Sequence, residues 1–152
     1  MINFDELLKS SLSVVNEGYQ TAFDDLVDIV DRLNKSIKSN AGDNFALEWQ
    51  CIKDEVKGSL FRIYFDTDEN NPKAEAITIS SIFIPSLGYP VTYGAYSFKA
   101  RVFSEGGKCS SKEELEEYFS GFLASPESPL IQAIGFAMRK AGDDIEDGVV
   151  PF

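Results

Sequence analysis

A long amphipathic helix at the start of the chain is the feature that most constrains the fold. Apolar side chains recur there at steps of three or four residues: Phe4, Leu8, Leu12, Val15, Tyr19, Phe23, Leu26, Val30, Leu33 and Ile37. The mean step of about 3.7 residues is close to the period of a straight α-helix and longer than the 3.5 of a coiled coil. Because the pattern keeps its phase across Gly18, it predicts one helix rather than two.

This helix is too long for a compact domain to cover. At 1.5 Å per residue it would extend for about 50 Å, which exceeds the width of a domain of this size. Asn3 and Glu6 resemble a capping box at its start, and the segment SNAG at 39–42 supplies a stop. Either the helix bends at Gly18, or one end overhangs the body and packs on a second copy of the chain. The second possibility predicts a homodimer through this helix.

The rest of the chain predicts a sheet followed by two helices. Ser110 or Ser111, each with a Glu three residues later, and then Ser128 are the expected helix caps, with Pro129 at the first position of the last helix and a stop at Gly142. Short connections favour an antiparallel meander. We therefore expect a single α+β domain, residues 1–152, with a long N-terminal helix, a four-stranded antiparallel meander and two C-terminal helices packed on the sheet. The predicted strands are 45–52, 59–66, 76–84 and 91–103.

The absence of histidine excludes several kinds of catalytic site. Histidine is the commonest general base near neutral pH and the commonest zinc ligand, so Ser-His and Cys-His nucleophile pairs are excluded as well. An enzyme would have to use carboxylates, Lys or Tyr, and no local pattern singles out such a pair. We expect Cys51 to be buried in a strand and Cys109 to lie near a surface turn, both as reduced thiols. The sequence predicts no catalytic residue, no metal and no cofactor.

Two segments begin like ligand-binding loops but lack essential positions. The segment DTDEN at 66–70 starts like a calcium loop, but Asn71 stands where the loop needs Gly and Ile77 where it needs a bidentate Glu. We interpret it as a hairpin turn. The segment EGGK at 105–108 lacks the spacing of a phosphate-binding loop, and it predicts a turn.

The charge of the chain favours a basic partner. Its 25 acids and 14 bases give a net charge of −11, which repels nucleic acid and anionic membranes and attracts cationic protein surfaces. Solubility alone is the simpler explanation of an acidic composition. No apolar run is long enough to span a membrane, and the first residues lack the pattern of a secretory signal. We expect a cytoplasmic protein that binds neither nucleic acid nor membrane.

The residues expected to contact a basic partner fall into three groups. Acids recur on the helix face opposite the apolar stripe, others form an acidic tail over 143–152, and two tyrosines belong to the aromatic segment 81–98. A solvated helix face and an ordinary β-hairpin are the simpler explanations of the first and third groups. The predicted contact residues are Glu17, Asp24, Asp28, Asp31, Tyr89, Tyr93, Asp143, Asp144, Glu146 and Asp147.

These observations favour a non-enzymatic binding protein that neutralises or escorts a basic protein, as inhibitors, immunity proteins and secretion chaperones do. The alternative is a small-molecule binding or enzymatic domain with a pocket between the sheet and the helices. That pocket would be lined by Trp49, Tyr64, Tyr93 and Tyr96.

Overall fold

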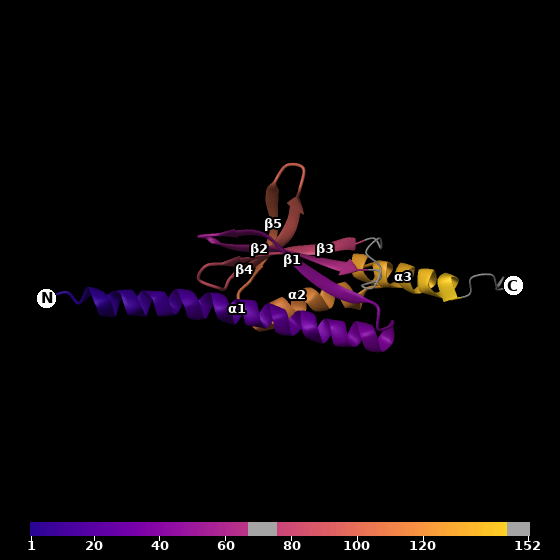
Figure 1. Ribbon diagram of the computed structural model, residues 1–152, viewed down its shortest axis with the longest axis horizontal. Coiled ribbons are helices and arrows are strands. Elements are labelled where there is room, and N and C mark those ends of the chain that lie inside the picture. Colours follow the sequence, from indigo (N-terminus) through magenta and orange to yellow (C-terminus); the bar gives the residue numbers. More distant parts are fainter. Residues whose placement is uncertain (67–75, 146–152) are drawn as a thin grey trace.

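One long helix, five strands and two shorter helices follow one another along the chain (Figure 1). The computed structural model describes residues 1–66 and 76–145, the last three as backbone only. Residues 67–71 of the segment that begins like a calcium loop lie outside this part. The elements are α1 (Phe4–Asn40), β1 (Ala46–Glu55), β2 (Gly58–Asp66), β3 (Ala76–Pro85), β4 (Val91–Ser97), β5 (Val102–Cys109), α2 (Lys112–Ala124) and α3 (Pro129–Ile145).

Helix α1 runs unbroken through Gly18. At its start the Asn3 side chain accepts a hydrogen bond from the backbone N–H of Glu6 (3.2 Å). At its end the N–H of Ala41 donates to the carbonyl of Ile37 (2.8 Å). The prediction of one helix with a cap at Asn3 is confirmed.

The strands form one antiparallel sheet in the order β1-β2-β3-β4-β5. The α+β class is therefore confirmed, but the prediction of four strands is wrong. Segment 91–103, expected to be one strand, turns at residues 98–101 and separates β4 from β5. Arg101 has a φ of 56°, and the Ser97 hydroxyl accepts a hydrogen bond from the N–H of Ala100 (3.1 Å). The turn contains neither Gly nor Pro, and the alternation of apolar and polar residues in the strand continues through it. The sequence therefore predicts one continuous strand.

Residues 105–108, predicted to form a turn, lie in β5. The pairing of β4 with β5 shifts after Tyr93, which leaves Gly106 as an extra residue in β5. A β-carbon on Gly94 would overlap the carbonyl oxygen of Ser104. These glycines therefore allow a bulge and a close approach of two strands instead of a turn.

Helices α1 and α2 pack on each other beneath the sheet in Figure 1. Side chains from alternate positions of the strands meet these helices, while no helix of the described residues covers the other face of the sheet (Figure 1). The buried residues form one hydrophobic core: Ala22, Leu26, Ile29, Val30, Leu33, Ile37, Phe45, Leu47, Phe61, Ile63, Phe65, Ile82, Ile84, Val91, Cys109, Leu115, Phe119, Leu130, Ala133 and Ala137.

The two cysteines have environments opposite to those predicted. Cys51 is exposed, because β1 is an edge strand and its pairing shifts directly after this residue. Cys109 is buried, because the chain passes from the end of β5 almost directly into α2, which packs on β5.

The predicted starts of both C-terminal helices are confirmed. The Ser111 hydroxyl accepts a hydrogen bond from the N–H of Glu114 (3.3 Å) at the start of α2. The Ser128 hydroxyl accepts one from the N–H of Ile131 (3.2 Å), and α3 begins at Pro129.

The predicted stop of the last helix is wrong, because α3 continues past Gly142 to Ile145. A Gly inside a helix costs only about 1 kcal/mol relative to Ala, which is too little to end a helix by itself. The backbone of Asp143 and Asp144 is therefore helical, while Glu146 and Asp147 lie outside the described residues.

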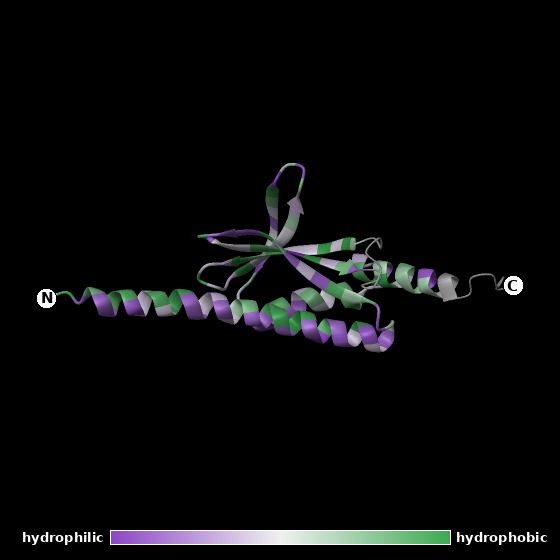
Figure 2. Ribbon diagram, in the orientation of Figure 1, coloured by the Kyte–Doolittle hydropathy of each residue, from purple (hydrophilic) through white to green (hydrophobic). Residues whose placement is uncertain are grey.

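Only the second half of α1 packs on the body of the protein. Ala22 and Leu26 are fully buried, whereas every residue from 4 to 14 is exposed. We call residues 4–17 the overhang, and Figure 2 shows hydrophobic residues along it. Of the two possibilities for a helix of this length, the structure has the overhang.

The overhang begins where the β3–β4 connection crosses α1. A β-carbon on Gly18 would overlap the carbonyl oxygen of Leu87, and one on Gly88 would overlap the carbonyl oxygen of Gly18. Gly88 also has a φ of 91°, which side-chain-bearing residues rarely adopt. Helix and loop thus touch through their backbones. Next to this contact, the Tyr19 hydroxyl donates a hydrogen bond to Ser59 Oγ (2.8 Å).

Replacing Gly18 with Ala tests this backbone contact. Ala is favoured over Gly in a helix by about 1 kcal/mol. We nevertheless expect Gly18→Ala to lower the free energy of unfolding by about 1–3 kcal/mol, because the loop must move away from the helix. The matched control is Gly121→Ala in α2, where the new methyl group meets nothing within 4 Å; it should raise the free energy of unfolding by up to about 1 kcal/mol. Urea denaturation followed by Trp49 fluorescence measures both, and equal stabilisation by the two substitutions would contradict the contact.

Candidate functional site

Acids of α1 are tied to α2 by two cations. The Asp28 carboxylate lies 2.9 Å from Lys112 Nζ and 3.0 Å from Arg32 Nε. Arg32 Nη2 in turn lies 2.9 Å from Glu116 of α2, and Lys112 Nζ lies 3.9 Å from Asp25. These ion pairs link the two helices across their outer surface.

The ion pairs shift the pKa values of the groups that form them. The hydrogen bond from Lys112 is the largest cause that lowers the pKa of Asp28, and the same bond raises the pKa of Lys112. The hydrogen bond to Glu116 raises the pKa of Arg32. The groups are exposed to solvent, so the pairs add little to stability. Asp28, predicted to contact a partner, is therefore already engaged within the chain.

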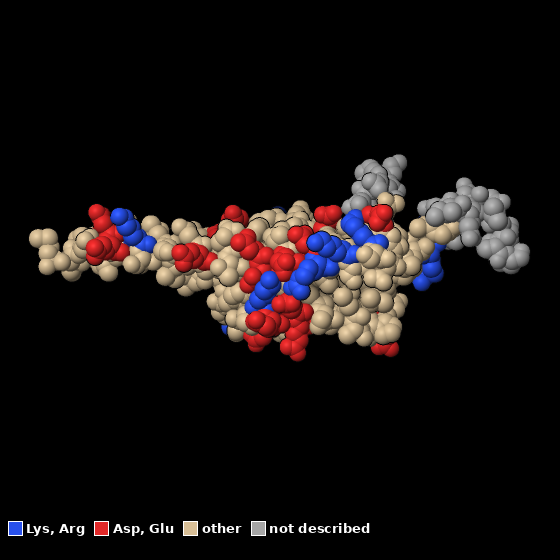
Figure 3. Space-filling model, turned by 90° about the horizontal axis from the view of Figure 1, so that it is seen from below, with Lys and Arg blue, Asp and Glu red and all other residues tan. Residues whose placement is uncertain are grey.

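The other predicted acids of α1 remain on the outer surface. Glu17, Asp24 and Asp31 are exposed, and the first two accept hydrogen bonds from side chains one turn away on the same helix. Helix α2 adds Glu113 and Glu117, which are exposed as well. Figure 3 shows acidic side chains gathered around the middle of the molecule, beside a band of Lys and Arg.

The charges of the described chain are segregated between its two sides. Residues 17–40 and α2 together contain nine acids and four bases. The strands and their described connections, residues 46–66 and 76–109, contain five acids and six bases. The helical side is therefore anionic, and the sheet is close to neutral.

The two predicted contact tyrosines are used inside the protein. The Tyr89 hydroxyl donates a hydrogen bond to Asp25 Oδ2 (2.8 Å). Burial, followed by this bond to a carboxylate, raises the pKa of Tyr89 far above its ordinary value. The Tyr93 ring stacks on Tyr118 of α2 with centroids 3.9 Å apart. Both side chains are half-buried and attach the β3–β4 connection and β4 to the helices.

The aromatic residues predicted to line a pocket between the sheet and the helices do not converge there. Trp49 packs against Phe23 of α1 with centroids 5.2 Å apart, and Tyr93 faces α2. Tyr64 and Tyr96 lie on the open face, where Arg62 stands 4.7 Å from the Tyr64 ring and Lys53 stands 5.5 Å from the Tyr96 ring.

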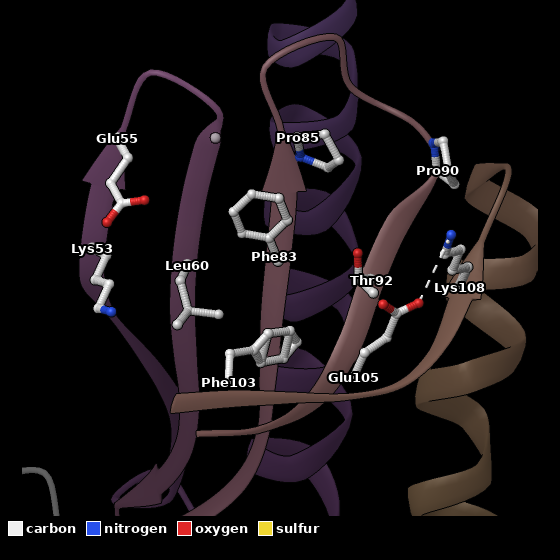
Figure 4. Close-up of a pocket in the computed structure, with 11 residues that line it drawn as sticks. Lys53, Glu55, Leu60, Phe83, Pro85, Pro90, Thr92, Phe103, Glu105 and Lys108 are labelled. Atoms are coloured by element: carbon white, nitrogen blue, oxygen red, sulfur yellow. Dashed lines mark ion pairs between the residues drawn. The ribbon is translucent and has the colours of Figure 1, made fainter. Parts of the chain in front are cut away.

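A hollow of about 430 Å³ lies on the open face of the sheet. A single row of paired residues crosses it from one edge to the other: Lys53 pairs with Leu60, Leu60 with Phe83, Phe83 with Thr92 and Thr92 with Lys108. Figure 4 shows these side chains in front of the sheet, with α1 behind it. The hollow thus has an apolar centre and a cation at each end.

Two irregularities in the edge strands and a fold of the β4–β5 hairpin shape this hollow. Ile52 in β1 and Gly106 in β5 are extra residues, and they bring Lys53 and Lys108 onto the open face. Phe103 and Glu105 of β5 close one side, and Glu105 lies 3.9 Å from Lys108 (Figure 4).

Sequence reasoning missed the hollow and most of the ion pairs. The hollow depends on the strand register and on an extra residue after Cys51, and neither is visible in the alternation of β1. The pair between Asp28 and Arg32 could have been found, because residues four apart on a helix are neighbours. The contacts with Lys112 and Glu116 join distant segments.

Comparison with known proteins adds no functional information. No protein-family model matches the chain, and no curated protein or solved structure matches it either. Among the described residues, no group of three or more His, Cys, Asp or Glu side chains could hold a metal ion. No helix in the described part of the chain is long and apolar enough to cross a membrane.

Proposed function

We propose that the protein is a non-enzymatic binding protein that neutralises or escorts a basic protein through the outer surface of α1 and α2. The segregation of charge carries the proposal: nine acids and four bases on the helical side, against five acids and six bases over the sheet. A cationic partner would be steered to the helical side, because attraction between opposite charges orients two proteins as they approach each other.

The contact residues of this proposal form a fixed arrangement. Glu17, Asp24 and Asp31 extend over about 20 Å of α1, and Glu113 and Glu117 lie on the neighbouring helix. This extent suits one interface of standard size, about 800 Å² per partner. The ion pairs of Asp25, Asp28, Arg32, Lys112 and Glu116 link the two helices that carry these carboxylates. The tail acids Asp143, Asp144, Glu146 and Asp147 stay a prediction, since their side chains are not described.

Affinity capture with charge variants tests the proposal. The tagged protein, incubated with a lysate of its source cells, should retain a protein of basic composition at low salt and release it at high salt. The triple variant Asp24→Asn/Asp31→Asn/Glu117→Gln should weaken the binding of that purified protein about tenfold or more, because each exposed pair contributes up to about 1 kcal/mol.

The matched control removes three acids from other surfaces, with Glu55→Gln, Glu105→Gln and Glu127→Gln. Equal binding by both triple variants would argue against the helical side as the contact surface. Captured proteins that are not basic, or that ignore salt, would count against the proposed partner class.

The hollow on the open face supports a second candidate function, the binding of a small amphiphilic molecule. Its volume lies within the range of ligand pockets, about 300–1,000 Å³. Leu60, Phe83 and Phe103 provide apolar surface, and Lys53 and Lys108 can receive an anionic group. This pocket lies on the face opposite to the one predicted from the sequence.

Binding of 2-naphthoate, an aromatic carboxylate, tests the second candidate. In nuclear magnetic resonance spectra it should shift the amide signals of Leu60, Phe83 and Thr92, and Lys53→Gln/Lys108→Gln should weaken the effect several-fold. The control Lys57→Gln/Lys99→Gln removes two exposed cations that do not line the hollow. Unchanged spectra, or shifts spread over the helices, would contradict a ligand site in the hollow.

A further inference from the structure

The overhang presents an apolar face that no other described part of the chain covers. Phe4, Leu8 and Leu12 are 76%, 59% and 49% exposed, and Leu7 and Val14 are exposed too. With 3.6 residues per turn, Phe4, Leu8 and Leu12 lie on the same side of α1 as its buried residues, and Leu7 and Val14 flank that side. The overhang therefore continues the core-facing stripe of the helix beyond the edge of the sheet.

We infer that this face packs on the same face of a second copy of the chain, in an antiparallel helix pair that makes the protein a symmetric dimer. An interface about a twofold axis uses one surface patch twice, and an apolar stripe along a helix is self-complementary in this way. The inference does not depend on the proposed basic partner, which contacts the opposite side of α1.

The charges of the overhang favour a second copy over other occupants. Residues 4–17 contain only Asp5, Glu6, Lys9 and Glu17 as charged residues, so the overhang carries a net charge of −2 in a chain of −11. A basic protein would find little to attract it here. The overhang offers an anionic membrane surface a single cation, Lys9, whereas helices that bind such surfaces are rich in Lys and Arg. Two overhangs meet with little repulsion.

The charge of the body decides the orientation of the pair. A parallel arrangement would place the two acidic segments, residues 17–31, side by side. An antiparallel arrangement separates them by the length of the overhang, about 20 Å, which exceeds the Debye length of about 8 Å at physiological ionic strength. The antiparallel pair therefore avoids most of the repulsion.

The antiparallel pair also covers a second exposed apolar residue. Leu87, 58% exposed, lies where the overhang leaves the body, with its backbone against Gly18. Full overlap of two overhangs brings the exposed Met1 and Ile2 of one copy near Leu87 of the other. Five apolar side chains per overhang provide roughly 100 Å² each. With the three residues at the ends, the interface approaches the standard size of about 800 Å² per partner.

Mass measurement with a matched pair of variants tests the dimer. Light scattering at micromolar concentrations should give twice the chain mass of 16.9 kDa. Leu8→Asp should give the monomer, whereas Ser13→Asp, which adds the same charge on the opposite side of the same helix, should leave the dimer. Both residues are exposed, and unchanged Trp49 fluorescence shows that the fold is kept.

Disulfide cross-linking tests the face and the orientation in a Cys51→Ser background, which removes the exposed thiol. Ser11→Cys, on the apolar side near the middle of the overhang, should link two copies, and Ser13→Cys should not. Ile2→Cys should link only in a parallel pair.

A lone species of 16.9 kDa, or a dimer that Leu8→Asp leaves intact, would overturn the inference. Linking by Ser13→Cys as fast as by Ser11→Cys would place another face at the interface and overturn it too. Linking by Ile2→Cys would overturn the antiparallel orientation. A monomer that binds phosphatidylcholine vesicles through the overhang would identify a membrane surface as the occupant instead.

Discussion

A helix of 37 residues cannot be covered by strands of seven to ten residues. The helix extends for about 55 Å and the strands for about 25–35 Å. The sheet therefore buries the apolar stripe of α1 from Ala22 to Ile37 and leaves the same stripe exposed at Phe4, Leu8 and Leu12. The contact of Gly18 with the β3–β4 connection lies at the boundary between the two halves. This mismatch of length determines which surfaces of the protein are available to other molecules.

Helix α1 serves both proposed surfaces, since the acids proposed to contact a basic partner and the exposed apolar residues lie on opposite sides of the helix. In the antiparallel dimer the two acidic segments are at opposite ends of the assembly. Such a dimer presents two separate sites, and a partner that reaches both of them gains affinity without any new contact. The hollow on the open face of the sheet faces away from α1, so a ligand there is compatible with both interfaces.

The elements that depend on local sequence could be predicted, and those that depend on register could not. The spacing of the apolar stripe and the cap at Asn3 predict α1, and the serine caps predict the starts of α2 and α3. The turn that ends at Arg101 was missed because a backbone with positive φ stands there without Gly or Asn. The exposure of Cys51 follows from its position in an edge strand, which single-strand alternation does not reveal. The acids of α1 were found, but Lys112, which pairs with Asp25 and Asp28, and Glu116, which pairs with Arg32, lie about 80 residues further along the chain.

In the proposed dimer, the two halves of α1 are held by different molecules: the second half by its own sheet, the first half by a second copy. Amide hydrogen exchange of α1, followed by mass spectrometry at low and at high protein concentration, tests this most directly. An isolated helix of about 14 residues, the length of the overhang, is only marginally stable in water. We expect residues 22–37 to be protected at both concentrations and residues 4–17 to become protected only at the higher one. Protection of residues 4–17 that does not change with concentration would contradict it.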